Sequence, residues 1–173
     1  MIHAYRSLTP RVHPSAFIAD SAHVIGDVEL EEDTSVWFCS VLRADVHVIR
    51  VGRGTNIQDG TIMHVNRGGQ PTILGDFVTI GHAARLHGCR IADHCLIGIG
   101  AIVLDGVEVG EESLVAAGSL VAPGTKIPPR SFVIGTPAKV RRAVDEADLD
   151  LIRRSARNYI ALKNEYRTAG DAR

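Results

Sequence analysis

One aliphatic residue returns every six positions along most of this 173-residue chain. The first run is Val12, Ile18, Val24, Leu30, Val36, Leu42 and Val48, and the second is Ile91, Ile97, Val103, Val109, Val115, Val121, Ile127 and Val133. Helices and flat strands repeat every 3.6 and 2 residues, so a short fixed period of six points to a solenoid. Six residues per side and three sides per coil predict a mainly β fold, a triangular parallel β-helix with these aliphatic residues inside.

The repeat slips in phase twice between the two runs. After Val48 it slips by three residues, and the inward positions become Val51, Ile57 and Met63. A polar stretch at residues 66–71 then has the composition of a loop. The inward positions resume at Leu74, Ile80 and Leu86 and slip by one residue to Ile91. We therefore expect a β-helix over about residues 10–138 with a loop excursion at 66–71.

Residues 145–167 carry a different pattern, which is typical of a helix. Acidic residues open the segment, and apolar residues follow at spacings of three and four, beginning with Leu149, Ile152 and Ala156. This pattern predicts a C-terminal α-helix that packs along one face of the prism. The whole chain, residues 1–173, is expected to form a single domain.

The composition gives no reason to expect a charged macromolecular partner. The formal net charge is −1 and the sequence pI is about 6.7, which disfavours binding to nucleic acid or to an anionic membrane. The N-terminal residues lack a signal-peptide pattern, and no stretch of 18 apolar residues occurs. We expect a cytoplasmic protein that binds neither nucleic acid nor membrane.

The repeat also determines which of the eight histidines can meet. If residues 66–71 bulge out of the coil, one full turn after Met63 arrives at Leu86, and each of these residues is followed by a histidine. His64 and His87 should then stack on adjacent coils, about 4.8 Å apart, and point outward from the same side. Two imidazoles at this spacing suit a shared metal ion.

His82 lies on the neighbouring side of the prism in this scheme and faces away from the other two histidines. A corner separates it from His87, so it cannot easily bind the same ion within one chain. Three prisms packed about a threefold axis would bring His82 of one subunit to His64 and His87 of the next. The pattern therefore predicts a homotrimer with three equivalent sites at its interfaces.

The same stacking gathers polar residues around one corner. Ile57 should lie beneath Ile80, which places Asp59 under His82. With the slip of three residues, Leu42 is expected beneath Ile57. The residues expected side by side near this corner are Arg43, Asp45, Gln58 and Asp59.

These residues also carry a family resemblance. The segments concerned are Arg43-Ala44-Asp45, Asn56-Ile57-Gln58-Asp59-Gly60, Met63-His64, Ile80-Gly81-His82, Leu86-His87-Gly88-Cys89, Gly98-Ile99-Gly100-Ala101, Leu104-Asp105-Gly106 and Gly135-Thr136-Pro137-Ala138-Lys139. Together they resemble the gamma-class carbonic anhydrase family over nearly the whole chain, and the three-histidine pattern is the most specific part. The resemblance implies a left-handed β-helix homotrimer with a C-terminal helix.

The resemblance further implies an activity. His64 and His87 of one subunit and His82 of its neighbour would hold Zn²⁺, with Fe²⁺ or Co²⁺ as possible replacements. The reaction would be the reversible hydration of CO₂ to bicarbonate by zinc-bound hydroxide. Three neutral imidazoles leave the metal its full charge and an open position for this purpose.

Five further residues receive roles from the same resemblance. Gln58 would orient the hydroxide and Asp59 would support the site. Arg43 and Asp45 would form an ion-pair network between subunits, with Arg43 also available to bicarbonate. Tyr159 on the C-terminal helix would approach the pocket.

The chain departs from the best-characterised members near the proton-transfer groups. An acidic position of the family is Val46 here, and residues 66–71 contain no carboxylate. Low hydratase activity is therefore expected; His47 is a candidate substitute, although an exposed residue without a role is the simpler interpretation. The alternatives are a hexapeptide-repeat acyltransferase, which needs one histidine base, a metal-dependent acyl-CoA thioesterase, and a non-catalytic metal-binding scaffold.

Overall fold

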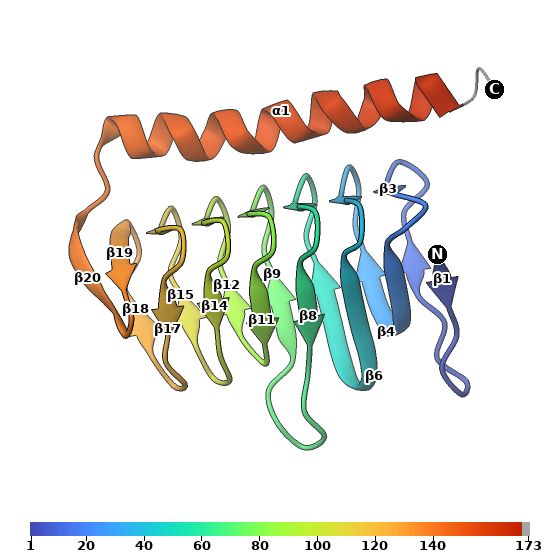
Figure 1. Cartoon of the computed structure of the whole chain (residues 1–173), viewed down its shortest axis with the longest axis horizontal. Coiled ribbons are helices and arrows are strands. Elements are labelled where there is room, and N and C mark those ends of the chain that lie inside the picture. The colour runs from blue at the N-terminus through green and yellow to red at the C-terminus, as the bar shows by residue number, and fades with distance from the viewer. Residues whose placement is uncertain (171–173) are drawn as a thin grey trace.

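The chain folds as a parallel β-helix with one long helix along its side (Figure 1). This computed structural model describes residues 1–170, and it confirms the predicted fold class. A 12-stranded sheet forms two sides of the prism, because two long strands turn the corner between them, and an 8-stranded sheet forms the third. We name the sides the histidine face, the charged face and the helix face.

Each face is a column of short strands, one from each coil. The histidine face contains β1 (Ile2–His3), β8 (Ile62–His64), β11 (Arg85–His87), β14 (Ile102–Val103), β17 (Leu120–Val121) and the first halves of β4 (His23–Leu30) and β6 (Val41–Val51). The charged face contains β2 (Arg11–Val12), β9 (Thr72–Leu74), β12 (Arg90–Ile91), β15 (Glu108–Val109), β18 (Lys126–Ile127) and the second halves of β4 and β6. The helix face contains β3 (Phe17–Ile18), β5 (Ser35–Val36), β7 (Asn56–Ile57), β10 (Thr79–Ile80), β13 (Leu96–Ile97), β16 (Leu114–Val115), β19 (Ser131–Gly135) and the antiparallel β20 (Ala138–Ala143).

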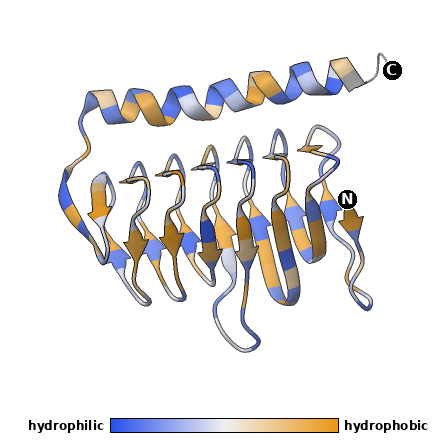
Figure 2. Cartoon of the chain, viewed as in Figure 1, coloured by the Kyte–Doolittle hydropathy of each residue, from blue (hydrophilic) through white to orange (hydrophobic). Residues whose placement is uncertain are grey.

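The repeated aliphatic residues fill the interior, and Figure 2 shows apolar positions on the strands of every coil. Val48 is an exception to the predicted pattern, because it is only half-buried and Ile49 is fully buried instead. Gly26 pairs with Ala44 and Val28 pairs with Ile49, so β6 carries three extra residues between these pairs. The insertion shifts the alternation of side chains, and a shift of one residue exchanges inside for outside.

The two predicted slips and the loop excursion are present. Met63 pairs with Leu86, 23 residues later, because the chain between β8 and β9 leaves the coil as a long loop (Figure 1). Leu86 pairs with Val103 and Ile91 pairs with Val109, so the later coils return to a spacing close to 18 residues. The loop is therefore an insertion that leaves the stacking of the coils intact.

The C-terminal helix α1 (Glu146–Gly170) lies along the helix face, close to the predicted 145–167. It begins with a reciprocal capping pair, in which the backbone N–H of Asp148 donates to Asp145 and that of Asp145 donates to Asp148. Leu149, Ile152 and Ala156 are buried against the prism. Within residues 1–170, no helix is long and apolar enough to cross a bilayer.

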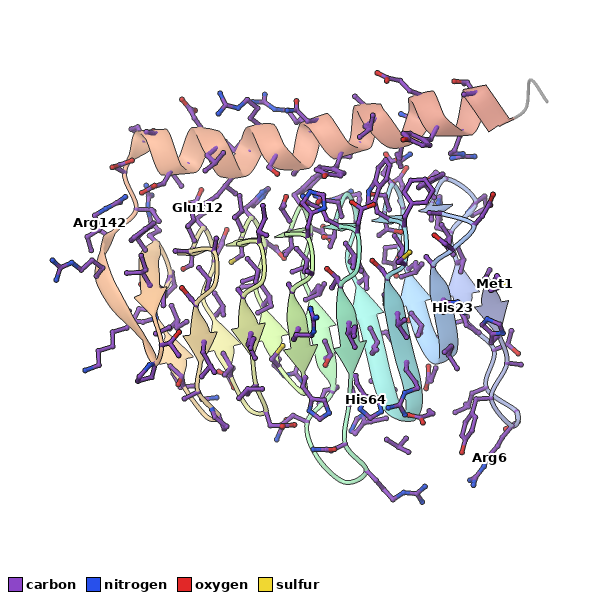
Figure 3. All side chains as sticks on the ribbon, in the orientation of Figure 1. Met1, Arg6, His23, His64, Glu112 and Arg142 are labelled. Atoms are coloured by element: carbon purple, nitrogen blue, oxygen red, sulfur yellow. The ribbon has the colours of Figure 1, made fainter. Side chains whose placement is uncertain are left out.

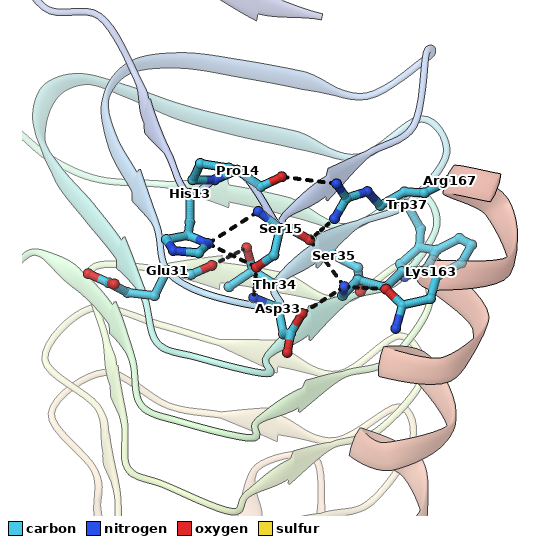
Figure 4. Close-up of polar contacts among 11 residues, drawn as sticks. His13, Pro14, Ser15, Glu31, Asp33, Thr34, Ser35, Trp37, Lys163 and Arg167 are labelled. Atoms are coloured by element: carbon cyan, nitrogen blue, oxygen red, sulfur yellow. Dashed lines mark hydrogen bonds and ion pairs between the residues drawn. The ribbon is translucent and has the colours of Figure 1, made fainter. Parts of the chain in front are cut away.

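The far end of α1 is fixed by a buried lysine (Figure 4). Lys163 is fully buried, and its Nζ lies 2.8 Å from Asp33 Oδ1 and 3.1 Å from the carbonyl oxygen of Ser15. Beside it, the ring of Trp37 packs edge-on against Tyr159, with centroids 5.3 Å apart. A buried charge is tolerated only when it is paired and hydrogen-bonded, so this contact sets the position of the helix along the prism.

Candidate metal centre

His64 and His87 lie side by side on the histidine face, as their spacing predicts. They are directly opposite one another in the pairing of β8 with β11, and Figure 3 places His64 at the edge of the prism. His64 Nδ1 lies 3.1 Å from His87 Nε2, and both side chains are half-buried. We refer to these two residues as the histidine pair.

A carboxylate contacts the outer nitrogen of each ring in the histidine pair. Asp45 Oδ1 lies 3.1 Å from His64 Nε2, and Asp105 Oδ1 lies 2.9 Å from His87 Nδ1. When each outer N–H donates to its carboxylate, the two inner nitrogens both present lone pairs. Asp105 is the site residue that the sequence analysis missed, although its place 18 residues after His87, about one coil further, is a usable signal.

Two lone pairs that face each other at 3.1 Å require a proton or a cation between them. Two imidazole nitrogens on one tetrahedral zinc ion are about 3.3 Å apart, given Zn–N distances of about 2.0–2.1 Å. The separation in the histidine pair therefore fits two positions of a zinc site. Within residues 1–170 of a single chain, no third histidine, cysteine or carboxylate completes a metal-binding group.

His82 lies elsewhere in the chain, on the turn that follows β10 of the helix face. Its Nδ1 is 2.8 Å from Asp59 Oδ2, and its Nε2 is 3.5 Å from the hydroxyl of Tyr159 on α1. Burial, and then the charge of Asp59, raise the pKa of Tyr159, so the phenol stays protonated near neutral pH. We call His82, Asp59 and Tyr159 the His82 group; its Asp59–His82 contact is the one expected from the sequence.

The positions of Arg43 and Asp45 differ from those predicted from the sequence. Leu42 pairs with Met63 and not with Ile57, because the three-residue insertion lies within this coil and lengthens it to 21 residues. Both polar residues therefore lie beside His64 on the histidine face, not beside Gln58 and Asp59. Burial raises the pKa of Asp45, but hydrogen bonds from His64 and Arg43 outweigh it and hold that pKa below its ordinary value.

Gln58 lies next to Asp59 in sequence, and its side chain is buried. Its amide nitrogen donates to Asn56 Oδ1 at 3.2 Å, and Asn56 in turn donates to Thr79 Oγ1 at 2.9 Å. The amide is thus fixed by a buried hydrogen-bond network of β7 and β10. One chain consequently carries two separate sets of polar residues, the histidine pair on one face and the His82 group with Gln58 on another.

The sequence of the chain is similar to a repeat family and to carbonic anhydrases. The family model described as bacterial transferase hexapeptide (six repeats) matches residues 88–123. The chain is 46% identical over 166 residues to a carbonic anhydrase of Geobacillus kaustophilus, covering 96% of this chain and 90% of that protein. It is 47% identical over 159 residues to the mitochondrial gamma carbonic anhydrase 2 of Arabidopsis thaliana, covering 89% of this chain.

The lengths of the relatives differ. The chain spans 57% and 56% of the length of two plant relatives. Among solved structures, a hexapeptide transferase family protein from Anaplasma phagocytophilum superposes with a TM-score of 0.91 at 41% identity, covering 95% of this chain and 97% of that one. Near full-length similarity to a bacterial carbonic anhydrase and the six-residue repeat show that the chain belongs to the gamma-class carbonic anhydrase family of hexapeptide-repeat proteins.

Proposed function

We propose that this protein is a zinc-dependent carbonic anhydrase that interconverts CO₂ and bicarbonate at sites shared between the subunits of a homotrimer. The observation that carries the proposal is the convergence of the two inner nitrogens in the histidine pair, each backed by a carboxylate. Carboxylates behind histidine ligands are the usual arrangement at zinc sites. The carbonic anhydrases among its relatives support the same reaction.

The third ligand in this proposal is His82 from a neighbouring subunit. Asp59 holds the Nδ1 side of its ring, and Nε2, which the hydroxyl of Tyr159 approaches only to 3.5 Å, is the nitrogen that would bind the metal. The outer surface of the histidine face supports close packing of subunits, because Ile62 is 43% exposed in the single chain. On the turn of the next coil above His82, Ile99 is 57% exposed. Apolar surface of this kind favours burial against another chain.

Each group at the proposed site has a separate role in the reaction. Zinc would supply a Lewis acid that lowers the pKa of a water at its open position toward 7. Asp45, Asp105 and Asp59 hold the three imidazoles in the tautomers that present a lone pair. The fixed amide of Gln58 orients the nucleophile, and Arg43, which is exposed and paired with Asp45, is available to the bicarbonate anion. Fe²⁺ and Co²⁺ suit the same imidazole ligands.

A transferase activity is the second candidate, because the Anaplasma relative is named as a hexapeptide transferase family protein. Such an enzyme would use one histidine as a general base and would bind an acyl donor without a metal. Two results would support the transferase: binding of coenzyme A by the metal-free protein, and acyl transfer that does not require zinc. The pairing of two imidazoles with two carboxylates favours the metal site.

The proposal is tested by zinc content and stopped-flow CO₂ hydration of the wild type, His82→Ala and His94→Ala. His94 stacks on Phe77 away from both sets of residues and serves as the control. We expect about one zinc per chain and measurable hydration in the wild type and the control, and loss of both in His82→Ala. Zinc without hydration would contradict the activity, and the absence of zinc from the wild type would contradict the site.

A further inference from the structure

We propose that a cleft beside the histidine pair binds small oxyanions and that bicarbonate is its natural occupant. The cleft has a volume of about 320 Å³ and lies at one edge of the prism. Three departures from the regular coil border it, namely the turn at Tyr5–Leu8, the insertion in β6 and the loop between β8 and β9. In Figure 3, Arg6 and His64 lie along this edge. The identity of the occupant rests on the proposed function, whereas the binding itself does not.

The charges around the cleft favour an anion. Within residues 1–170, neither Arg6 nor Arg67 forms an ion pair with a carboxylate, and both line the cleft. The two acids that also line it are paired with basic groups: Asp27 Oδ1, which is buried and accepts no hydrogen bond within residues 1–170, lies 2.8 Å from Arg50 Nη2 as an ion pair, and Asp45 contacts both Arg43 and His64. The carboxylates are thus balanced by other groups, and the two arginines leave an excess of positive charge.

His47 adds a hydrogen-bond donor to the same cleft. The backbone N–H of Val48 donates to His47 Nδ1 at 2.8 Å, which identifies Nδ1 as the acceptor nitrogen. The proton of the neutral ring therefore lies on Nε2, so His47 offers an N–H donor at Nε2. Guanidinium groups offer donors only. A ligand that meets Arg6, Arg67 and His47 together must supply acceptor oxygens, as a small oxyanion does.

Asp45 connects the cleft to the candidate metal centre. One of its oxygens contacts His64, and the same residue lines the cleft, so an anion held there is one side chain away from the histidine pair. Positive potential at the mouth of a site raises the local concentration of an anionic substrate and speeds its arrival. The cleft would in this way supply bicarbonate to the site, and its effect would weaken as ionic strength rises.

The test is calorimetric titration of sodium bicarbonate into four proteins at constant ionic strength. They are the wild type, the double variant Arg6→Gln/Arg67→Gln, the variant His82→Ala, and a control double variant Arg141→Gln/Arg154→Gln. The control removes two exposed arginines outside the cleft, one on β20 and one on α1. The His82→Ala variant removes the proposed third zinc ligand, which lies on another side of the prism, and keeps every residue of the cleft and the contacts of Asp45.

We expect the control to bind bicarbonate as the wild type does, and His82→Ala to retain the binding at the cleft. The Arg6→Gln/Arg67→Gln variant should bind about tenfold more weakly or worse, because it loses two charged donors. Unchanged binding in that variant, or an equal loss in the control, would overturn the proposal. Loss of all bicarbonate binding in His82→Ala would place the anion at the metal centre alone and would also overturn the proposal. Hydration assays report separately on the proposed function.

Discussion

The histidine face and the charged face are built from the same six-residue repeat, but they present different side chains to the outside. One column of outward positions on the histidine face runs through His23, Val41, Ile62, Arg85, Ile102 and Leu120. Outward positions along the charged face are Arg11, Glu29, Arg50, Ile73, Arg90, Glu108 and Lys126. Four of the six positions in the first column are apolar, whereas the second column nearly alternates in charge.

The two faces differ in whether their outward side chains find partners within the same chain. On the charged face, Glu29 lies 2.8 Å from Arg11 and 3.0 Å from Arg50, so the ladder pairs its charges within the chain. Exposed pairs of this kind add about 0.2–1 kcal/mol each and suit a face in contact with water. The apolar residues of the first column cannot form such pairs, and they lie on the face that carries the histidine pair. The histidine face is therefore the surface that we expect to pack against other subunits.

The largest expected effect comes from placing a charge on each face in turn. Ile62→Glu should dissociate the oligomer, since an uncompensated carboxylate buried at each interface costs about 3–5 kcal/mol. Ile73→Glu is the matched control, because Ile73 lies between Arg50 and Arg90 and a glutamate there completes the alternation of charge. Light scattering after size-exclusion chromatography measures the mass of each variant. If the Ile62→Glu variant remained a trimer, the histidine face would not be the surface that contacts other subunits.

The next effect concerns the carboxylates behind the histidines. Asp105→Asn should weaken zinc binding about 10–100-fold, because the amide no longer accepts the Nδ1–H of His87 as a carboxylate does. Competition with a chromophoric chelator measures the affinity. Glu108→Gln on the charged face changes an acid that pairs with Lys126, and it should leave zinc affinity unaltered. If the two variants lost zinc affinity equally, Asp105 would have no special role in zinc binding, which would contradict the proposed site.

The smallest effect belongs to the charged face itself. A hydrogen bond from Arg11 lowers the pKa of Glu29, so the pair stabilises the fold above the ordinary glutamate pKa and loses that effect as pH falls through the lowered value. Glu29→Gln should reduce the free energy of unfolding by about 0.2–1 kcal/mol at neutral pH. The difference from the wild type should shrink on acidification, as measured by urea denaturation. A difference that grows at low pH would have the wrong sign for this pair.

The sequence predicted the fold well because one inward side chain per six residues is a strong and local signal. It also predicted that His64 and His87 stack, since only a loop of the right length had to be removed from the coil. It failed for Arg43 and Asp45, because the slip of three residues lengthens this coil by an insertion, whereas the predicted pairing of Leu42 with Ile57 required a shorter coil. Side-chain pairings such as Asp105 with His87 depend on the direction of side chains at a corner, which periodicity alone does not specify.

The central claim is that each metal centre draws residues from two subunits, and mixing two defective variants tests it directly. His64→Ala keeps the His82 group, and His82→Ala keeps the histidine pair, so each variant alone should bind little zinc. Unfolding and refolding the two together in equal amounts should restore zinc to about a quarter of the sites, because random assortment in a closed trimer pairs complementary neighbours that often. A mixture with no more zinc than the separate variants would contradict the shared centre, as would full zinc content in His82→Ala alone.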